Sequence, residues 1–226
     1  MMRTVFACAA AAAALLAASS ASAQNGPQVA WNVGLVSDYV FRGFSQTDEE
    51  PALQAGVDLT AGSFYAGAWA SSVDFGDDTE AEVDLYGGFR TEAAGFAFDI
   101  GAVAYLYVEA PDGADYDYVE LKAAASRAIG PVTAGAVVYY SPDFFGLDEE
   151  AAYVEGNVAF APVDKWTVSA ALGYQALDVN DDYTTWNVGA GYALTDNLAV
   201  DLRYHGADID GPLSDDRIVG GLKFTF

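Results

Sequence analysis

Apolar and polar residues alternate along the stretch TEAEVDLYGGFR (residues 79–90), and this alternation indicates the class of fold. One side carries small or apolar residues, namely Ala81, Val83, Leu85, Gly87 and Phe89. The other side carries Glu80, Glu82, Asp84, Tyr86, Gly88 and Arg90. A period of two residues is that of a β-strand with one apolar and one polar face. The stretch therefore predicts a strand whose two faces meet different surroundings.

The same alternation recurs along the chain, and no segment shows a sustained helical period. It predicts strands near residues 29–43, 51–60, 63–76, 79–90, 95–109, 116–127, 132–141, 151–161, 166–177, 183–194, 198–206 and 216–226. These segments form one continuous meander without a domain break. The prediction is an all-β chain of about twelve antiparallel strands, with ten strands as the alternative.

The connections between these segments alternate in length and charge. Those at 61–62, 91–94, 128–131, 162–165 and 195–197 are short, and those between them are mostly longer and rich in Asp and Glu. In an up-and-down meander all the short connections lie at one end. Short turns at one end and long loops at the other are typical of an outer-membrane barrel.

Strand length and face chemistry favour a transmembrane up-and-down barrel over a secreted β-sandwich, which is the alternative. Most segments reach the roughly 9 to 11 residues that cross a bilayer when tilted, whereas sandwich strands are shorter. Full charges lie on one face and almost none on the other, as expected if that other face meets lipid. Aromatic residues are predicted to form two girdles, one of Trp31, Tyr65, Phe89, Phe96, Phe160 and Trp166 near the short turns, the other of Tyr39, Phe41, Phe75, Tyr140, Tyr174 and Tyr204 near the long loops.

The N-terminus predicts export. Residues 1–23 contain Arg3, an apolar run and the small-residue end Ala21-Ser22-Ala23, the layout of a secretory signal peptide, and residues 24–226 are then the barrel. The alternative is an N-terminal anchor, but the apolar run is shorter than a bilayer span. Cys8 lies in this segment, so the mature chain has no cysteine for a disulfide or a metal site.

Composition and motifs exclude several functional classes. With 33 Asp and Glu against 9 Lys and Arg, the chain has a net charge of −24 and repels nucleic acid. His205 is the only histidine, and by parity it shares the polar face with Asp201 and Arg203, not the lipid-facing side that a lipase-type barrel would use. No nucleotide-binding, protease or EF-hand motif is present. We therefore expect no catalytic residues, no cofactor and no metal site.

The charged and polar residues of the inward face are the candidate functional set. They are predicted to line a channel, and they are Asp38, Arg42, Gln54, Asp58, Glu82, Asp84, Arg90, Asp99, Glu120, Lys122, Glu155, Asp201, Arg203, Arg217 and Lys223. Within the first hairpin, Gln54 and Asp58 are expected to lie near Arg42 and Asp38. Such charges either surround an open pore or pair with one another to fill a narrow barrel.

Three motifs carry a resemblance to a known family. SDYVFRGFSQT (37–47), PALQAG (51–56) and the pattern E-x-D-L-Y-x-G from Glu82 to Gly88 resemble the TorF family of porins, which contains the Gcw_chp domain. The resemblance runs across essentially the whole mature chain. It implies an outer-membrane barrel and supplies no catalytic residues.

The function that the sequence predicts is passive diffusion of small solutes across the bacterial outer membrane, with a preference for cations because the mouth is acidic. The first alternative is a structural or adhesion barrel with a filled lumen, and an outer-membrane enzyme is the second. The expected partners are outer-membrane lipid and lipopolysaccharide, small solutes or ions, and the barrel insertion machinery, which would read the terminal Phe226. The oligomeric state is left open.

Overall fold

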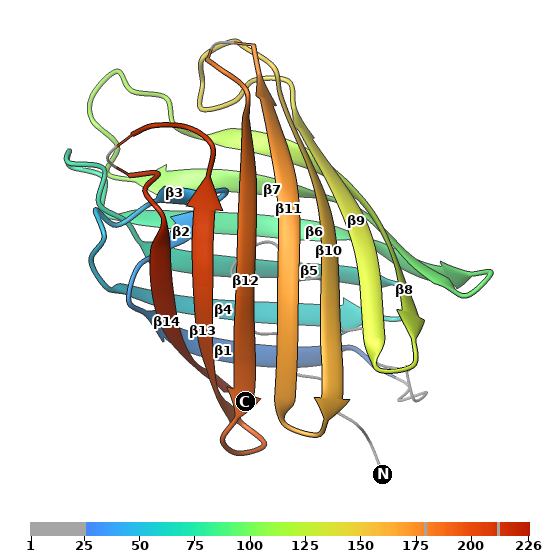
Figure 1. The fold of residues 1–226 in the computed structure, drawn as a ribbon. Helices are drawn as coiled ribbons and strands as arrows, with labels where there is room; N and C mark the ends of the chain where they lie inside the picture. Colours follow the sequence, from blue (N-terminus) through green and yellow to red (C-terminus); the bar gives the residue numbers. More distant parts are fainter. Residues whose placement is uncertain (1–25, 179, 212) are drawn as a thin grey trace.

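Twelve strands close into a single antiparallel barrel in the computed structural model, which describes residues 26–178, 180–211 and 213–226 (Figure 1). The predicted signal peptide, residues 1–23, lies outside the described residues. The barrel strands are β1 (Gln28–Val36), β4 (Ala52–Ala61), β5 (Phe64–Ser72), β6 (Ala81–Ala93), β7 (Phe96–Val108), β8 (Tyr118–Ile129), β9 (Val132–Ser141), β10 (Ala151–Val163), β11 (Trp166–Leu177), β12 (Tyr183–Ala193), β13 (Leu198–Ala207) and β14 (Arg217–Thr225).

Each barrel strand pairs with its neighbour in the chain, and β1 closes the barrel against β14. The closing register runs from Asn32↔Thr225 to Val36↔Gly221. The predicted twelve-stranded meander is therefore confirmed. In the part of the chain that the structure describes, no helix is long and apolar enough to cross a membrane.

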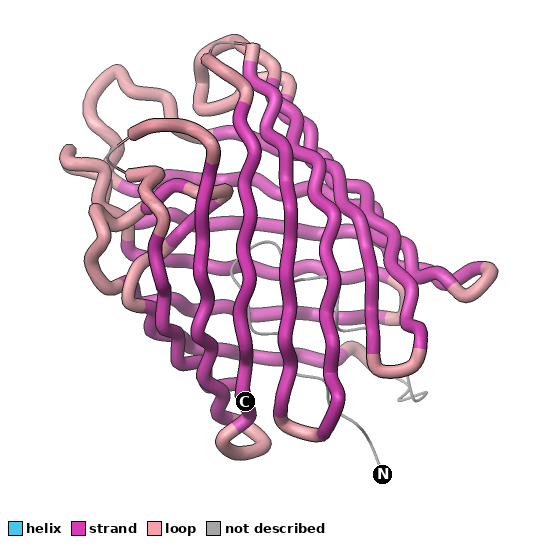
Figure 2. Tube along the Cα trace, viewed as in Figure 1, coloured by secondary structure: helices cyan, strands magenta, loops and turns pink. Residues whose placement is uncertain are grey.

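Short turns and long loops lie at opposite ends of the barrel, as the connection lengths predicted (Figure 2). At the short-turn end, β6 and β7 are joined by Ala94 and Gly95, whose φ angles of 53° and 79° are those of a tight hairpin turn that matches the twist of the strands. The described C-terminus, Phe226, lies at this end and exchanges backbone hydrogen bonds with Trp31.

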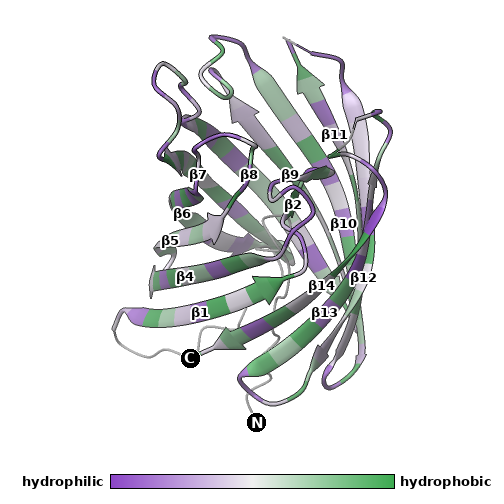
Figure 3. Ribbon diagram, turned by 90° about the vertical axis from the view of Figure 1, so that its left-hand side faces the viewer, coloured by the Kyte–Doolittle hydropathy of each residue, from purple (hydrophilic) through white to green (hydrophobic). Residues whose placement is uncertain are grey.

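The two faces of the wall differ as the alternation predicted, and Figure 3 shows the resulting bands of hydropathy along each strand. Side chains at the centre of the outer surface are apolar and exposed, including Ile100 (65%), Leu172 (61%) and Leu202 (61%). Aromatic pairs lie on the same surface near the short turns, such as Phe64 with Phe89 and Trp166 with Tyr192. Tyr65, which we predicted in this girdle, instead points into the barrel and donates to Asp99.

The prediction of one strand over residues 29–43 is wrong beyond Val36. There the chain leaves the wall, turns into the barrel and forms the short hairpin β2 (Val40–Phe41) and β3 (Phe44–Ser45). Tyr39 and Phe41 were predicted to face the lipid interface. Tyr39 is buried inside against Trp69, with ring centroids 5.3 Å apart, and Phe41 packs on Tyr105 at 5.9 Å.

Phe75 was also expected in a girdle near the long loops, and it too packs inside, 5.6 Å from Tyr107. These aromatic residues turn inward because the hairpin brings its own apolar surface into the barrel. Burying that surface against other rings removes it from water. We call residues 37–50, which leave the wall and return to it, the inner hairpin segment.

Candidate functional site

The tip of the inner hairpin segment is a two-residue turn made of Arg42 and Gly43. Their φ angles are 44° and 90°, so the turn is of the left-handed kind that joins tight hairpins. A Cβ atom added to Gly43 would lie 2.9 Å from the Cβ of Ala207, which places the tip directly against β13. Glycine is therefore required here both by its φ angle and by the close approach of β13.

Arg42 fastens this tip to the far side of the barrel. Its Nη1 and Nη2 atoms donate to the two carboxylate oxygens of Glu120 on β8, at 2.7 and 2.6 Å, and Nη1 also donates to Gln175 on β11 at 3.0 Å. The side chains of Arg42 and Glu120 are only 6% and 1% exposed. A two-pronged, dehydrated ion pair of this kind fixes the orientation of the guanidinium group as well as its position.

Aromatic rings also surround the guanidinium group of Arg42. The guanidinium carbon lies 4.4 Å from the ring centre of Tyr153 and 5.1 Å from that of Tyr139. Contacts at this distance are favourable cation–π interactions, and more so where water is excluded. Arg42 is thus held by strands β8 to β11 together, so the inner hairpin segment spans the lumen.

The base of the inner hairpin segment is held by Asp38. Its carboxylate accepts hydrogen bonds from Ser45 Oγ at 2.7 Å and Thr47 Oγ1 at 3.1 Å, and it forms an ion pair with Arg217 at 2.8 Å. Arg217 is the first residue of β14. Asp38 therefore ties the segment both to itself and to the last strand of the barrel.

A third attachment joins the segment to β6 and β7. Tyr39 donates to Glu82 Oε1 at 2.8 Å, and Tyr107 donates to Glu82 Oε2 at 2.9 Å. Glu82 is buried, and Asp84 follows it on the same inward face. Together with the Arg42 and Asp38 contacts, this makes a dense layer across the lumen near the long-loop end, which we call the constriction.

The short-turn half of the lumen is built differently. On one wall, Asp99 accepts from Tyr65 at 2.7 Å, from Lys122 at 2.9 Å and from Arg90 at 3.1 Å. On the opposite wall the guanidinium group of Arg203 donates hydrogen bonds to Asn187 at 2.7 Å, to Ser169 at 2.9 Å and to Asp201 at 3.2 Å. Arg90 remains 41% exposed and Asp201 17% exposed. Water therefore reaches this half, below the constriction.

Replacing Asp99 by alanine is expected to lower the free energy of unfolding by about 3 kcal/mol, because Lys122 would be left buried without its charge partner. The measurement is a urea titration of the folded barrel followed by tryptophan fluorescence. Asp58→Ala is the matched control, since Asp58 accepts from Tyr86 at 2.6 Å and its loss is expected to cost only about 1 kcal/mol. Equal losses in the two variants would show that the ion pair has no special role.

The fifteen sequence-predicted residues divide between these layers. Asp38, Arg42, Glu82, Asp84, Glu120 and Arg217 belong to the constriction, and Asp58, Arg90, Asp99, Lys122, Asp201 and Arg203 to the short-turn half. Glu155 accepts from Tyr153 at 3.0 Å beside Arg42. Gln54 is buried near Ser71, and Lys223 pairs with Gly34 in the closing register.

The expectation that Gln54 and Asp58 lie near Arg42 is wrong. It assumed that Arg42 remains in the wall, whereas the inner hairpin segment carries it across to Glu120. The residues that sequence reasoning missed are the partners on the other strands, namely Tyr105, Tyr107, Tyr139, Tyr153 and Gln175. These tyrosines fall on the same face of their strands as the inward charges. Several aromatic side chains on the inward face indicate that part of the lumen is packed and not filled with water.

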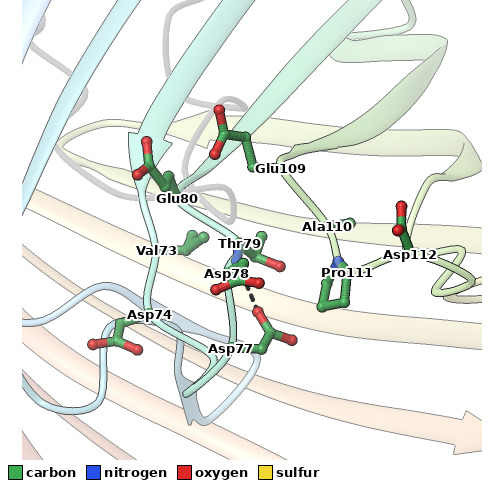
Figure 4. Close-up of a pocket in the computed structure, with 10 residues that line it drawn as sticks. All are labelled: Val73, Asp74, Asp77, Asp78, Thr79, Glu80, Glu109, Ala110, Pro111 and Asp112. Carbon is green, nitrogen blue, oxygen red and sulfur yellow. Dashed lines mark hydrogen bonds between the residues drawn. The ribbon is translucent and has the colours of Figure 1, made fainter.

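The long-loop end above the constriction is strongly acidic. The connections there contain one basic residue, Arg42, and most of the acidic residues of the chain. A cavity of about 1000 Å³ opens between two of these loops, and its lining includes Asp74, Asp77, Asp78, Glu80, Glu109 and Asp112 (Figure 4). The field of such a rim attracts cations and repels anions.

Comparison with solved structures places the fold among outer-membrane channels at low sequence identity. The chain is similar to a KdgM porin solved in complex with disordered oligogalacturonate, with a TM-score of 0.62, 8% identity, and coverage of 88% of this chain and 98% of that one. It is similar to the NanC porin with a TM-score of 0.54, 10% identity, and coverage of 88% and 98%. For the COG4313 outer membrane channel from Pseudomonas putida F1 the values are 0.50, 12%, and 87% and 94%. At these identities the likeness establishes the fold.

Comparison of sequences gives two further findings. The profile of a bacterial protein family of unknown function, Gcw_chp, matches residues 20–221. No curated protein matches the chain.

Proposed function

Because the chain belongs to the Gcw_chp family of bacterial proteins of unknown function, we propose a function from the barrel itself, namely that of an outer-membrane channel for small solutes. The observation that carries the proposal is the closed wall with apolar side chains outside and charged side chains inside. Such a wall suits lipid on one side and water on the other. The resemblance to the TorF porins agrees with it.

The path through this channel would have two parts. In the short-turn half, Arg90 and Asp201 are accessible to water and would form a hydrated vestibule. At the constriction, the inner hairpin segment fills the section of the barrel and buries Arg42 and Glu120. Solutes would therefore be limited to those that pass beside the inner hairpin segment or when it moves.

The charges favour cations over anions. In the constriction the arginines are neutralised, Arg42 by Glu120 and Arg217 by Asp38. The excess charge is therefore that of the acidic rim above, whose negative field concentrates cations at the mouth. For this reason we do not extend to this chain the oligogalacturonate named with KdgM, since an acidic polymer would be repelled.

A second candidate is a structural barrel with a filled lumen. The observation that favours it is the burial of the constriction, where Tyr39, Glu120 and Gln175 are almost fully inaccessible. In this case the charges would serve only to hold the inner hairpin segment in place, and no solute would cross.

Planar-bilayer recording of the purified protein separates the two candidates. We expect step currents, and in a KCl gradient we expect a reversal potential displaced towards that of K⁺. A reversal potential displaced towards that of Cl⁻ would refute the electrostatic argument. If neither the wild type nor a variant with a loosened inner hairpin segment carries current, the barrel is structural.

A further inference from the structure

A second cavity lies at the long-loop end, against the inner hairpin segment. Its volume is about 320 Å³, within the range of small-molecule sites. The described residues that line it are Phe44, Ser45, Gln46, Phe75, Asp77, Tyr116, Phe145 and Leu213. Phe44 and Ser45 form β3, so any molecule in this cavity would touch the inner hairpin segment.

Three aromatic rings in this cavity lie at steep angles to one another. The rings of Phe75 and Tyr116 have centroids 6.0 Å apart and an interplanar angle of 79°, and those of Tyr116 and Phe145 are 5.9 Å apart at 61°. The faces of aromatic rings carry partial negative charge. Because the ring planes differ, the aromatic lining encloses the cavity from more than one side, and aromatic walls of this kind suit a compact cation better than a flat neutral molecule.

Asp77 supplies a full negative charge beside the rings. Its carboxylate accepts from Thr79 N at 2.8 Å and from Tyr116 Oη at 2.9 Å. These hydrogen bonds, those from Thr79 foremost, hold the pKa of Asp77 below its ordinary value. No lysine or arginine is among the described residues that line the cavity, so the carboxylate has no counter-ion there.

We infer that this cavity binds small organic cations, with an alkylated ammonium group against Phe75, Tyr116 and Phe145 and its charge beside Asp77. The inference rests on the proposed function, since it names a class of solute that would gather at the mouth of the channel. A small metal ion keeps its hydration shell and gains little from aromatic walls. A neutral solute gains nothing from Asp77, and an anion is repelled.

The test measures binding of choline to the folded, detergent-solubilised protein by isothermal titration calorimetry at constant ionic strength. The control ligand is 3,3-dimethylbutan-1-ol, which has the shape of choline without its charge. We expect saturable binding of choline and binding of the neutral alcohol that is weaker by about tenfold. Equal affinity for the two ligands would overturn the inference.

Variants locate the site. Asp77→Asn and Phe145→Leu are each expected to weaken choline binding by about fivefold. The matched control is Asp112→Asn, which removes the same charge from the neighbouring cavity and is expected to leave binding unchanged. If Asp112→Asn weakens binding as much as Asp77→Asn, choline is attracted by the acidic rim in general and the site does not exist. Heat-modifiable electrophoretic mobility confirms that each variant is folded.

Binding and conduction are measured separately, so the two proposals can fail independently. Choline that binds to a barrel without step currents would uphold the cavity and refute the channel. A conducting barrel in which choline shows no saturable binding would uphold the channel and refute the cavity.

Discussion

Replacement of Arg42 by alanine is expected to raise the single-channel conductance several-fold. The change leaves Glu120 buried without its charge partner, with the hydrogen bond from Tyr105 remaining, and removes the donor to the side-chain oxygen of Gln175. Removing one partner of a buried ion pair destabilises the structure by at least about 3 kcal/mol. A free-energy change of this size shifts the equilibrium between the inner hairpin segment bound across the lumen and the segment detached from it by about a hundredfold. Conductance of the variant and the wild type in the same planar bilayer, at the same voltage, measures the effect.

Two further variants make the Arg42 result specific. Arg42→Lys retains the charge but lacks the two-pronged geometry, so its conductance is expected to lie between those of the wild type and Arg42→Ala. Arg90→Ala removes an equally charged lumen residue that lies outside the constriction and is 41% exposed, and it is expected to change conductance little. Identical currents from the wild type and Arg42→Ala would show that the inner hairpin segment does not limit the path.

Replacement of Leu172 by arginine is expected to destabilise the barrel by about 2–4 kcal/mol in a lipid bilayer, the cost of a cationic side chain on the lipid face near the midplane. Leu172 lies near the middle of β11 and is 61% exposed on the outer surface. The measurement is urea-induced unfolding of the protein in lipid vesicles, followed by tryptophan fluorescence.

The control for Leu172→Arg is its neighbour Ala171→Arg, which places the same side chain on the inward face of the same strand. There the arginine would reach the water-accessible half of the lumen, and a much smaller loss of stability is expected. Similar losses for the two variants would contradict the proposal that lipid covers the outer surface.

Most of the barrel wall was predictable from sequence, because the face on which a strand residue lies depends only on its position along that strand. In β6, Glu82 and Leu85 fall on opposite faces whatever the rest of the chain does, since successive side chains of a strand alternate. The same rule correctly placed Asp99, Glu120 and Arg203 inside the barrel. Lengths of connections predicted which end carries the long loops, although strand ends shifted by a few residues.

The inner hairpin segment could not be predicted in this way because the alternation does not break where the chain leaves the wall. Tyr39 and Phe41 continue the apolar parity of Trp31 and Leu35, and so they read as lipid-facing. These side chains point inward because they contact residues far away in the sequence. Tyr39, for example, donates a hydrogen bond to Glu82, 43 residues away. Arg42-Gly43 has the composition of a tight turn, but the pattern alone could not say that the turn lies inside.

The tie between Asp38 and Arg217 joins groups 179 residues apart in the chain. Because Arg217 begins the last strand, this tie cannot form until β14 has met β1 and the circle is complete. The obstruction across the lumen is thus fully fastened only in a finished barrel. A partly assembled chain that lacks its final strand would keep the contacts of Arg42 and Tyr39 but not this one, so closing the wall and completing the attachment of the segment would be a single event.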